Sequence, residues 1–324
     1  SSQGEVYLPR WRGDAPPTGG KRGAVGTVWR ADEKGPAEDV GQEAPVPAVS
    51  SADGAGRGAP VSAVSSADDA APPRITRIVV VVPAHDERDR IAACVDSVIA
   101  SAQFTGLPVM VRVILDACTD DTAAMVPAGG GEVGVVKRIV DHRNVGAARA
   151  AGVDPLDLRA DVWLAHTDAD TVVAPDWLSA QLAHADAGAD AVVGSIGVAD
   201  WEQRPGGLRA VFERLYDDAP GHHHIHGANL GVRGSAYGWV GGFRALAESE
   251  DVDLVERLVA SGARVERVAD CRVVTSARVS RRTGGGMSGY LDELAAREVA
   301  AGDSARSGAS APAGETALEP HRPT

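Results

Sequence analysis

Two carboxylates spaced one residue apart are the feature of this sequence most suited to chemistry. A short apolar run, residues 163–165, leads into Asp168 and Asp170. If that run is a buried strand, both carboxylates follow its carboxyl end, where ligands bind in open α/β sheets. Alternate residues of an extended segment point the same way, so both side chains could face one site. Two oxygen ligands of this kind suit Mg²⁺ or Mn²⁺, and such a cation suits a diphosphate.

Chance is the competing explanation for this triplet, because the chain contains 45 Asp and Glu residues and a second Asp-x-Asp at 251–253. Two other acidic strand ends favour a functional interpretation. Asp86 with Glu87 follows one apolar run, and Asp116 follows another. A single carboxylate at a strand end is usually a helix cap or part of a solvated turn, but three such ends on one sheet edge predict a shared polar cleft.

Short apolar runs alternate with stretches of helical spacing along the middle of the chain. The expected strands are residues 78–82, 111–115, 135–140, 162–165 and 191–194. Helical spacing follows position 91, covers 144–151 and resumes after Pro175, and Asp86 is expected to cap the first helix. This alternation predicts an α/β fold with a doubly wound, mostly parallel, Rossmann-like sheet and flanking helices. The G-x-G-x-x-G match at 129–134 precedes a strand instead of following one, so it is interpreted as a glycine-rich loop.

A second acidic pair lies at the expected start of a later helix. Apolar spacing from position 252 to 259 is helical, and Gly262 supplies a stop signal. Glu250 and Asp251 are therefore expected at the helix N-terminus. The helix dipole there favours the ionised carboxylate that a general base requires.

Together these segments resemble the family 2 glycosyltransferases of GT-A fold over roughly residues 76–280. The similarity rests on motifs in the same order along the chain, at 82–87, 116–122, 144–149, 168–170, 227–229 and 250–251. The resemblance implies that Asp168 and Asp170 hold Mn²⁺ or Mg²⁺ and that Asp251, beside Glu250, deprotonates the acceptor. It implies that the donor nucleotide is held by Pro83, Ala84, Glu87, Asp116, Arg149 and Asp168. On the acceptor side it points to His226, Gly227, Asn229, Arg281 and Arg282.

Three departures from the family pattern affect these expectations. Leu115 stands where many members have an Asp, so recognition of the base is expected to differ. Asp86 replaces the Asn that usually precedes Glu87. Many members also have a His after the last strand as a metal ligand, but residues 271–276 contain none. Asp170, water and the diphosphate would then hold the metal.

Two groups of basic residues near the acceptor motif have open interpretations. The histidines at 222–224 and 226 directly precede Gly227. They are interpreted as a Zn²⁺ site, as contacts to acceptor hydroxyls, or, for His226, as an added ligand of the catalytic metal. A solvated run remains open for His222 and His223. For Arg281 and Arg282, a loop that closes over the site and plain surface exposure remain equally open.

Composition restricts the class of protein further. The net charge of −13 in 324 residues argues against nucleic acid as a partner, because phosphate backbones are bound by basic faces. Three widely spaced cysteines without a Cys-x-x-Cys motif indicate a reducing, cytoplasmic setting. No run approaches the roughly 20 apolar residues of a transmembrane segment, which leaves peripheral membrane or partner-protein contact open. Residues 1–73 and 301–324 are expected to be disordered, with the GT-A domain at 74–300.

The sequence therefore predicts a metal-dependent glycosyltransferase that moves a sugar from a nucleoside-diphosphate donor to the hydroxyl of an unidentified acceptor, with inversion. Two alternatives stay open. One is a retaining GT-A transferase or nucleotidyltransferase that uses the same cleft. The other is a degenerate GT-A domain that binds a nucleotide or a protein partner without catalysis.

Overall fold

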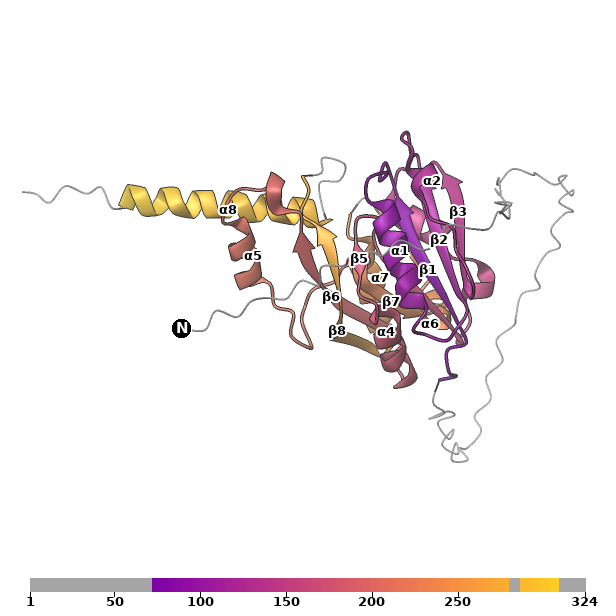
Figure 1. Ribbon diagram of the computed structural model, residues 1–324. Helices are drawn as coiled ribbons and strands as arrows, with labels where there is room; N and C mark the ends of the chain where they lie inside the picture. The colour runs from indigo at the N-terminus through magenta and orange to yellow at the C-terminus, as the bar shows by residue number, and fades with distance from the viewer. Residues whose placement is uncertain (1–71, 247, 280–285, 309–324) are drawn as a thin grey trace, which may run out of the picture.

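One mixed sheet organises the part of the chain that the computed structural model describes, residues 72–246, 248–279 and 286–308 (Figure 1). Its strands lie in the order β3-β2-β1-β4-β7-β6-β8-β5. The strands are β1 (Arg77–Ala84), β2 (Val109–Asp116), β3 (Val133–Val140), β4 (Val162–His166), β5 (Val172–Val173), β6 (Ala191–Ala199), β7 (Leu230–Arg233) and β8 (Val265–Ser276). The helices are α1 (Ile91–Ala102), α2 (Thr122–Met125), α3 (Val145–Ala151), α4 (Trp177–Asp186), α5 (Leu208–Leu215), α6 (Gly234–Trp239), α7 (Glu250–Ala260) and α8 (Gly286–Gly308). Short 3₁₀ turns are η1 (Pro155–Asp157), η2 (Trp201–Gln203) and η3 (Gly227–Asn229).

Strands β3, β2, β1 and β4 run parallel to one another. Val80 of β1 pairs with Val111 of β2 on one side and with Ala165 of β4 on the other, and all three residues are fully buried. Continuous apolar runs form strands in this setting because helices cover both faces of the sheet. Since parallel strands end at the same edge, the segments that follow β1, β2 and β4 meet there.

Strand β7 runs antiparallel to both of its neighbours, β4 and β6. Leu230 at its start pairs with His166 at the end of β4. The turn η3, which precedes β7, therefore lies beside the segment that carries Asp168 and Asp170. Strands β6 and β8 run parallel to each other and extend the sheet beyond this point.

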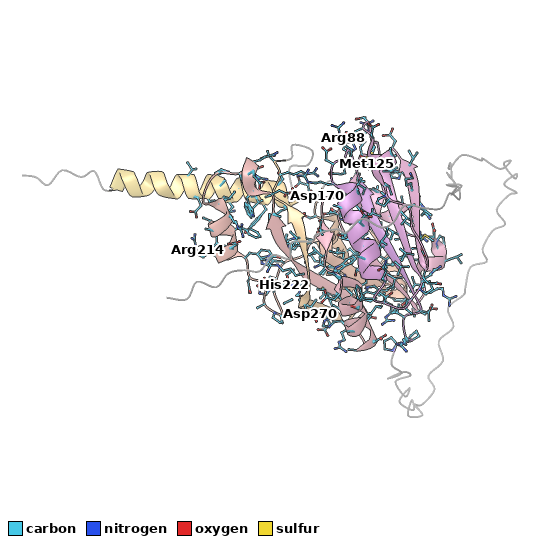
Figure 2. All side chains as sticks on the ribbon, in the orientation of Figure 1. Arg88, Met125, Asp170, Arg214, His222 and Asp270 are labelled. Carbon is cyan, nitrogen blue, oxygen red and sulfur yellow. The ribbon has the colours of Figure 1, made fainter. Side chains whose placement is uncertain are left out.

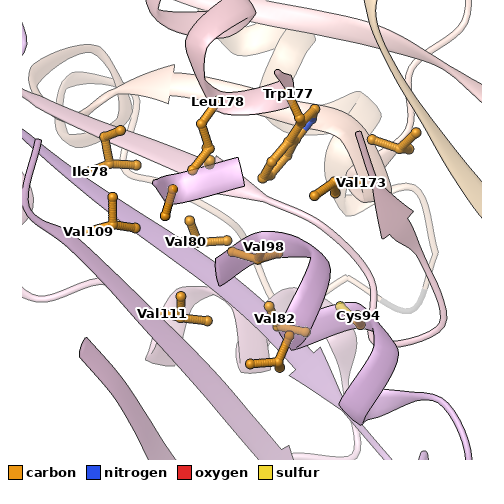
Figure 3. Packing of buried hydrophobic residues seen from close by; sticks show 14 of the residues in the cluster. Ile78, Val80, Val82, Cys94, Val98, Val109, Val111, Val173, Trp177 and Leu178 are labelled. Carbon is orange, nitrogen blue, oxygen red and sulfur yellow. The ribbon is translucent and has the colours of Figure 1, made fainter. Parts of the chain in front are cut away.

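Two apolar layers hold helices on the two faces of the sheet. On one face, α1 and α4 pack on the strands through a cluster that includes Val82, Val98 and Trp177 (Figure 3). On the opposite face, α3, α6 and α7 cover a cluster that includes Leu164 and Leu258. The sheet edge between these layers is thus held rigidly from both sides.

A third and smaller cluster joins α5 to α8. Phe212 of α5 packs with Leu291 and Leu294 of α8, and the two helices lie together at one end of the structure (Figure 1). Met287, in the first turn of α8, packs against the same cluster. This contact fixes the start of α8 relative to the sheet.

The α/β architecture predicted from the sequence is confirmed, since each predicted strand coincides with an observed one. Gly262 follows α7 with a φ of 83°, as its role as a stop signal requires. The predicted helix cap is wrong, because α1 begins at Ile91 and a turn separates it from Asp86. Asp86 instead accepts hydrogen bonds from the amides of Thr119 and Asp120.

The ends of the expected GT-A domain, residues 74 and 300, stay a prediction. Helix α8 continues to Gly308, beyond the expected boundary at residue 300. Residues 1–71 and 309–324, where disorder is predicted, lie outside the described residues. No helix in the described part of the chain is long and apolar enough to cross a membrane.

Candidate active site

A cavity of about 690 Å³ opens at the carboxyl edge of the parallel strands, where Figure 2 labels Asp170. It is lined by segments that follow β1, β2 and β4, together with η3 and the starts of α7 and α8. The sequence-predicted residues that line it are Pro83, Ala84, Glu87, Asp116, Arg149, Asp168, Asp170, His226, Gly227, Glu250 and Asp251. Asn229 is not among the lining residues, and Arg281 and Arg282 lie outside the described residues.

Arg149 joins the two acidic pairs inside this cavity. Its Nη2 donates to Oδ1 of Asp168, and its Nε donates to Oε1 of Glu250 at 3.3 Å. The side chain of Arg149 is 2% exposed and that of Glu250 is 9% exposed. Burial raises the pKa of Glu250, and the charge of Arg149 opposes that rise. Arg149 thus ties the loop after β4 to the N-terminus of α7.

Two glycines make room for this arrangement. A Cβ on Gly227 would lie 2.5 Å from Nη2 of Arg149. A Cβ on Gly146 would lie 2.2 Å from the carbonyl oxygen of Arg244 and 3.0 Å from Cβ of Glu250. Both positions therefore require glycine. A Cβ would collide with the backbone of Arg244 at Gly146 and with the guanidinium of Arg149 at Gly227.

Asp170 is held by two residues from the end of β8 and just beyond it. Oγ1 of Thr275 donates to Oδ1 at 3.3 Å, and Nη2 of Arg278 lies 3.1 Å from Oδ2. Arg278 also donates to both carboxylate oxygens of Glu87, from Nη1 at 2.7 Å and from Nη2. Burial and the neighbouring charge of Asp168 raise the pKa of Asp170 to about 6. Sequence reasoning missed Arg278, although its place directly after the last strand was a usable signal.

The pair of aspartates suits a hard divalent cation. Carboxylate oxygens are the ligands that Mg²⁺ and Mn²⁺ prefer. The raised pKa of Asp170 reflects burial and a second negative charge nearby, and a bound cation would relieve both. Among the residues described, no group of three or more His, Cys, Asp or Glu could hold a metal ion. Water and substrate would therefore complete the coordination.

Asp116 organises the loop between β3 and α3. Its Oδ1 accepts from the amides of His142 and Arg143 at 2.6 and 2.9 Å, and its Oδ2 accepts from the amide of Asn144 at 3.0 Å. Asn144 in turn caps α3 by accepting from the amide of Ala147. These bonds favour a positioning role for the Asp116 carboxylate over direct contact with a ligand.

Strained backbone gathers around the same cavity. Asp86, Ala117, Arg143 and Ser249 have φ values of 52°, 51°, 51° and 60°. This left-handed conformation costs a non-glycine residue on the order of 1 kcal/mol. Each of these residues adjoins or belongs to the cavity lining. Such strain persists only where the surrounding structure enforces it, and it is typical of active sites.

Asp251 lies at the N-terminus of α7 and lines the cavity. Its Oδ2 accepts from the amide of Gly227 at 2.6 Å, and its Oδ1 accepts from the amide of Val252 at 2.8 Å. These bonds orient the carboxylate, and the helix dipole favours its negative charge. Asp253, on the same helix, pairs with Arg257 instead and does not line the cavity.

Asn229 positions η3 without reaching the cavity. Its side chain is fully buried, and its Nδ2 donates to the carbonyl oxygens of Ser195 at 2.8 Å and Cys271 at 2.7 Å. Its Oδ1 accepts from Nε1 of Trp177 at 2.9 Å. Asn229 therefore ties η3, which also contains Gly227, to β6, β8 and α4.

Alternate histidines before η3 form a ladder of rings. The ring centroids of His222 and His224, and those of His224 and His226, are 5.9 Å apart, and Tyr216 stacks on His224 at 4.1 Å. The solvated run is a wrong interpretation for His222, which is buried, whereas His223 is exposed. The described part of the ladder forms no group that could hold a metal ion, so the structure gives the Zn²⁺ interpretation no support.

His226 is neutral at physiological pH. Burial and the neighbouring histidines lower the pKa of His226 to about 3. The hydroxyl of Tyr216 accepts from the amide of Ile196 and lies 3.0 Å from Nε2 of His226. This contact joins Tyr216 to His226 in the lining of the cavity. Tyr216 with Met287 and Tyr290 gives this end of the cavity an apolar and aromatic lining that sequence reasoning missed.

In open α/β sheets, ligands bind in a crevice at the carboxyl ends of the strands, and the acidic cavity lies at that edge. Residues 79–237 match the family model described as glycosyl transferase family 2. The matched segment contains the Asp168 and Asp170 pair and all of η3. Residues 79–237 therefore form a glycosyl transferase family 2 domain. A comparison with curated proteins gave no match.

Solved structures that match the chain include S. aureus TarS 1–349 in complex with UDP-GlcNAc. The two sequences are 13% identical, the match covers 69% of this chain and 66% of that chain, and the TM-score is 0.49. A further structure of S. aureus TarS 1–349 has 14% identity, coverage of 62% and 60%, and a TM-score of 0.45. The mannosyltransferase PcManGT from Pyrobaculum calidifontis, in complex with GDP-Man and Mn²⁺, has 20% identity, coverage of 65% and 59%, and a TM-score of 0.44. The chain thus covers less than two thirds of the length of these structures. By itself, this likeness assigns neither substrate nor mechanism.

Proposed function

We propose that this chain transfers a sugar from a nucleoside-diphosphate donor to an acceptor hydroxyl, with inversion at the anomeric carbon and with Mn²⁺ or Mg²⁺ as cofactor. One observation carries the proposal. The acidic pair after β4 and the acidic pair at the start of α7 line a single cavity and share Arg149 as a partner. The family supplies the reaction class.

On the donor side, Asp168 and Asp170 would hold the cation and face the diphosphate. The cation, when bound, would neutralise the charge that develops on the departing nucleoside diphosphate. Arg149 keeps the carboxylate of Asp168 in place through its buried ion pair. Pro83, near the end of β1, and Glu87, just after this strand, would enclose the nucleoside.

On the acceptor side, Asp251 is the general base in this proposal. It accepts the proton of the acceptor hydroxyl while the hydroxyl oxygen attacks the anomeric carbon from the face opposite the diphosphate. A C–O bond to the acceptor forms, the C–O bond to the diphosphate breaks, and the bonding electron pair leaves with the diphosphate. The amides of Gly227 and Val252 hold the Asp251 carboxylate in one orientation, which favours such a positioned proton transfer.

Release of UDP or GDP from a panel of nucleotide sugars, measured with Mn²⁺, tests the proposal. Asp251→Asn is expected to slow sugar transfer by roughly 10²–10⁴, the usual contribution of a general base, while nucleoside-diphosphate binding is retained. Asp170→Ala is expected to weaken both donor binding and turnover. Asp253→Asn is the matched control, since it removes a carboxylate from the same helix outside the cavity. Turnover of donor at the wild-type rate by both site variants would refute the assignment.

The stereochemical part of the proposal needs its own measurement. The anomeric configuration of the product, determined by NMR at early times, should be opposite to that of the donor. Retention would replace the single displacement with a different mechanism in the same cavity.

A further inference from the structure

Arg278 contacts two of the acidic residues that line the cavity, Glu87 and Asp170. It lies two positions after the end of β8, and its side chain is 20% exposed. Its guanidinium makes a two-point pair with the Glu87 carboxylate, and the same group contacts Oδ2 of Asp170 at 3.1 Å. Arg278 therefore places a fixed positive charge against one of the two carboxylates suited to a metal.

Each oxygen of the Asp170 carboxylate already has a partner in the protein. Its Oδ1 accepts from the hydroxyl of Thr275, and its Oδ2 faces Arg278. A divalent ion on the Asp170 carboxylate would meet the guanidinium at close range, where two positive charges repel strongly in a partly buried site. Contact of the guanidinium with this carboxylate therefore opposes binding of the ion there.

The two pairings of Arg278 differ in strength. The pair with Glu87 has two hydrogen bonds in the parallel geometry that gives arginine its strongest carboxylate contacts. The pair with Asp170 has one contact, at 3.1 Å. A competing cation would break the weaker contact first, and Glu87 would keep Arg278 at the site.

We propose that Arg278 is a resident counter-ion of Asp170 and that a divalent cation binds the cavity only by displacing it. This inference rests on the proposed function, because it concerns the cation which that function requires. Arg278 neutralises Asp170 in the metal-free protein, and it sets the metal affinity of the site below what the two aspartates alone would give. In this role it is a positioning residue.

Mn²⁺ titration of the metal-free full chain, followed by the EPR signal of free Mn²⁺, tests the inference. Arg278→Gln is expected to bind Mn²⁺ roughly tenfold tighter or more, because the ion no longer meets a positive charge 3.1 Å from Oδ2 of Asp170. Arg272→Gln is the matched control. Arg272 lies on β8, six positions before Arg278, and it pairs with Asp218, which does not line the cavity. The affinity of the Arg272→Gln variant for Mn²⁺ is expected to stay at the wild-type value.

A double variant separates direct competition from a general change in charge. In an Asp170→Asn background, Arg278→Gln is expected to lose its effect on Mn²⁺ affinity. The inference is overturned if Arg278→Gln binds Mn²⁺ no tighter than wild type, if Arg272→Gln tightens binding equally, or if the effect persists undiminished without the Asp170 charge. A gain in affinity cannot arise from misfolding. The titration contains no donor or acceptor, so its failure is distinguishable from a failure of sugar transfer.

Discussion

Replacement of Arg149 by Met removes the one side chain that joins the two acidic pairs. Arg149 is 2% exposed, and its partners differ in burial, since the side chain of Asp168 is 38% exposed and that of Glu250 is 9% exposed. Removal of one partner from a buried ion pair costs about 3–5 kcal/mol, because a buried charge is left without compensation. Water can solvate Asp168, so the penalty falls mainly on Glu250. We therefore expect the lower end of that range, about 3 kcal/mol.

Urea unfolding followed by far-ultraviolet circular dichroism measures this loss directly. For a domain of this size, about 3 kcal/mol corresponds to a fall of roughly 6–12 °C in Tm. The double variant Arg149→Met with Glu250→Gln should recover part of the loss, because the amide carries no charge to leave unpaired. Arg209→Met is the control. Arg209 pairs with Glu213 on the exposed face of α5, and such surface pairs contribute only about 0.2–1 kcal/mol.

Two results would refute this reasoning about Arg149. One is a loss of stability no larger than that of Arg209→Met. The other is a double variant as unstable as the single one, which would show that the uncompensated charge of Glu250 is not the cause.

Two further predictions concern the same cavity. Gly227→Ala should lower the free energy of unfolding by about 1–3 kcal/mol, the usual effect of overpacking, because its Cβ would lie 2.5 Å from Nη2 of Arg149. Gly206→Ala, with nothing within 4 Å, serves as its control in urea unfolding, and equal effects would contradict the prediction. The pKa of Asp170 is raised from 3.8 to about 6. Between these two pH values the folded metal-free protein holds a proton on Asp170 that the unfolded chain releases. The free energy of unfolding therefore falls as the pH rises from about 4 to about 6. Relative to Asp170→Asn, wild type should lose on the order of 3 kcal/mol between pH 4 and pH 7; a difference between the two proteins that does not change with pH would count against this.

Local patterns were sufficient to predict most of the fold and the position of the acidic pairs. The run 78–82 is apolar at every position because β1 is covered on both faces, and this requirement is visible in the sequence itself. Asp168, Asp170 and Asp251 were found because each lies next to a strand end or helix start that has its own local signal. Neighbouring residues alone thus indicated which segments would share a sheet edge.

Other features depend on partners that no local pattern contains. Arg278 pairs with Glu87 across 191 positions, so neither residue reveals the other in the sequence. Asn229 looks like an acceptor residue from its motif, but its side-chain hydrogen bonds go to β6, β8 and α4. Strand β7 has four residues, and so short a run does not indicate the direction of the strand. That direction is set by the antiparallel pairing of β7 with β4 and β6.

The reversal of β7 has a consequence for how such a protein can change during evolution. Because β7 runs against its neighbours, the chain enters this strand at the same sheet edge where β4 delivers Asp168 and Asp170. Residues 216–226, which bring Tyr216, His224 and His226 to the cavity, therefore form a separate segment between α5 and η3. The length and composition of residues 216–226 can vary without a change in the register of the strand that presents Asp168 and Asp170. The antiparallel strand β7 thus allows this segment to change independently of the strand that leads to Asp168 and Asp170.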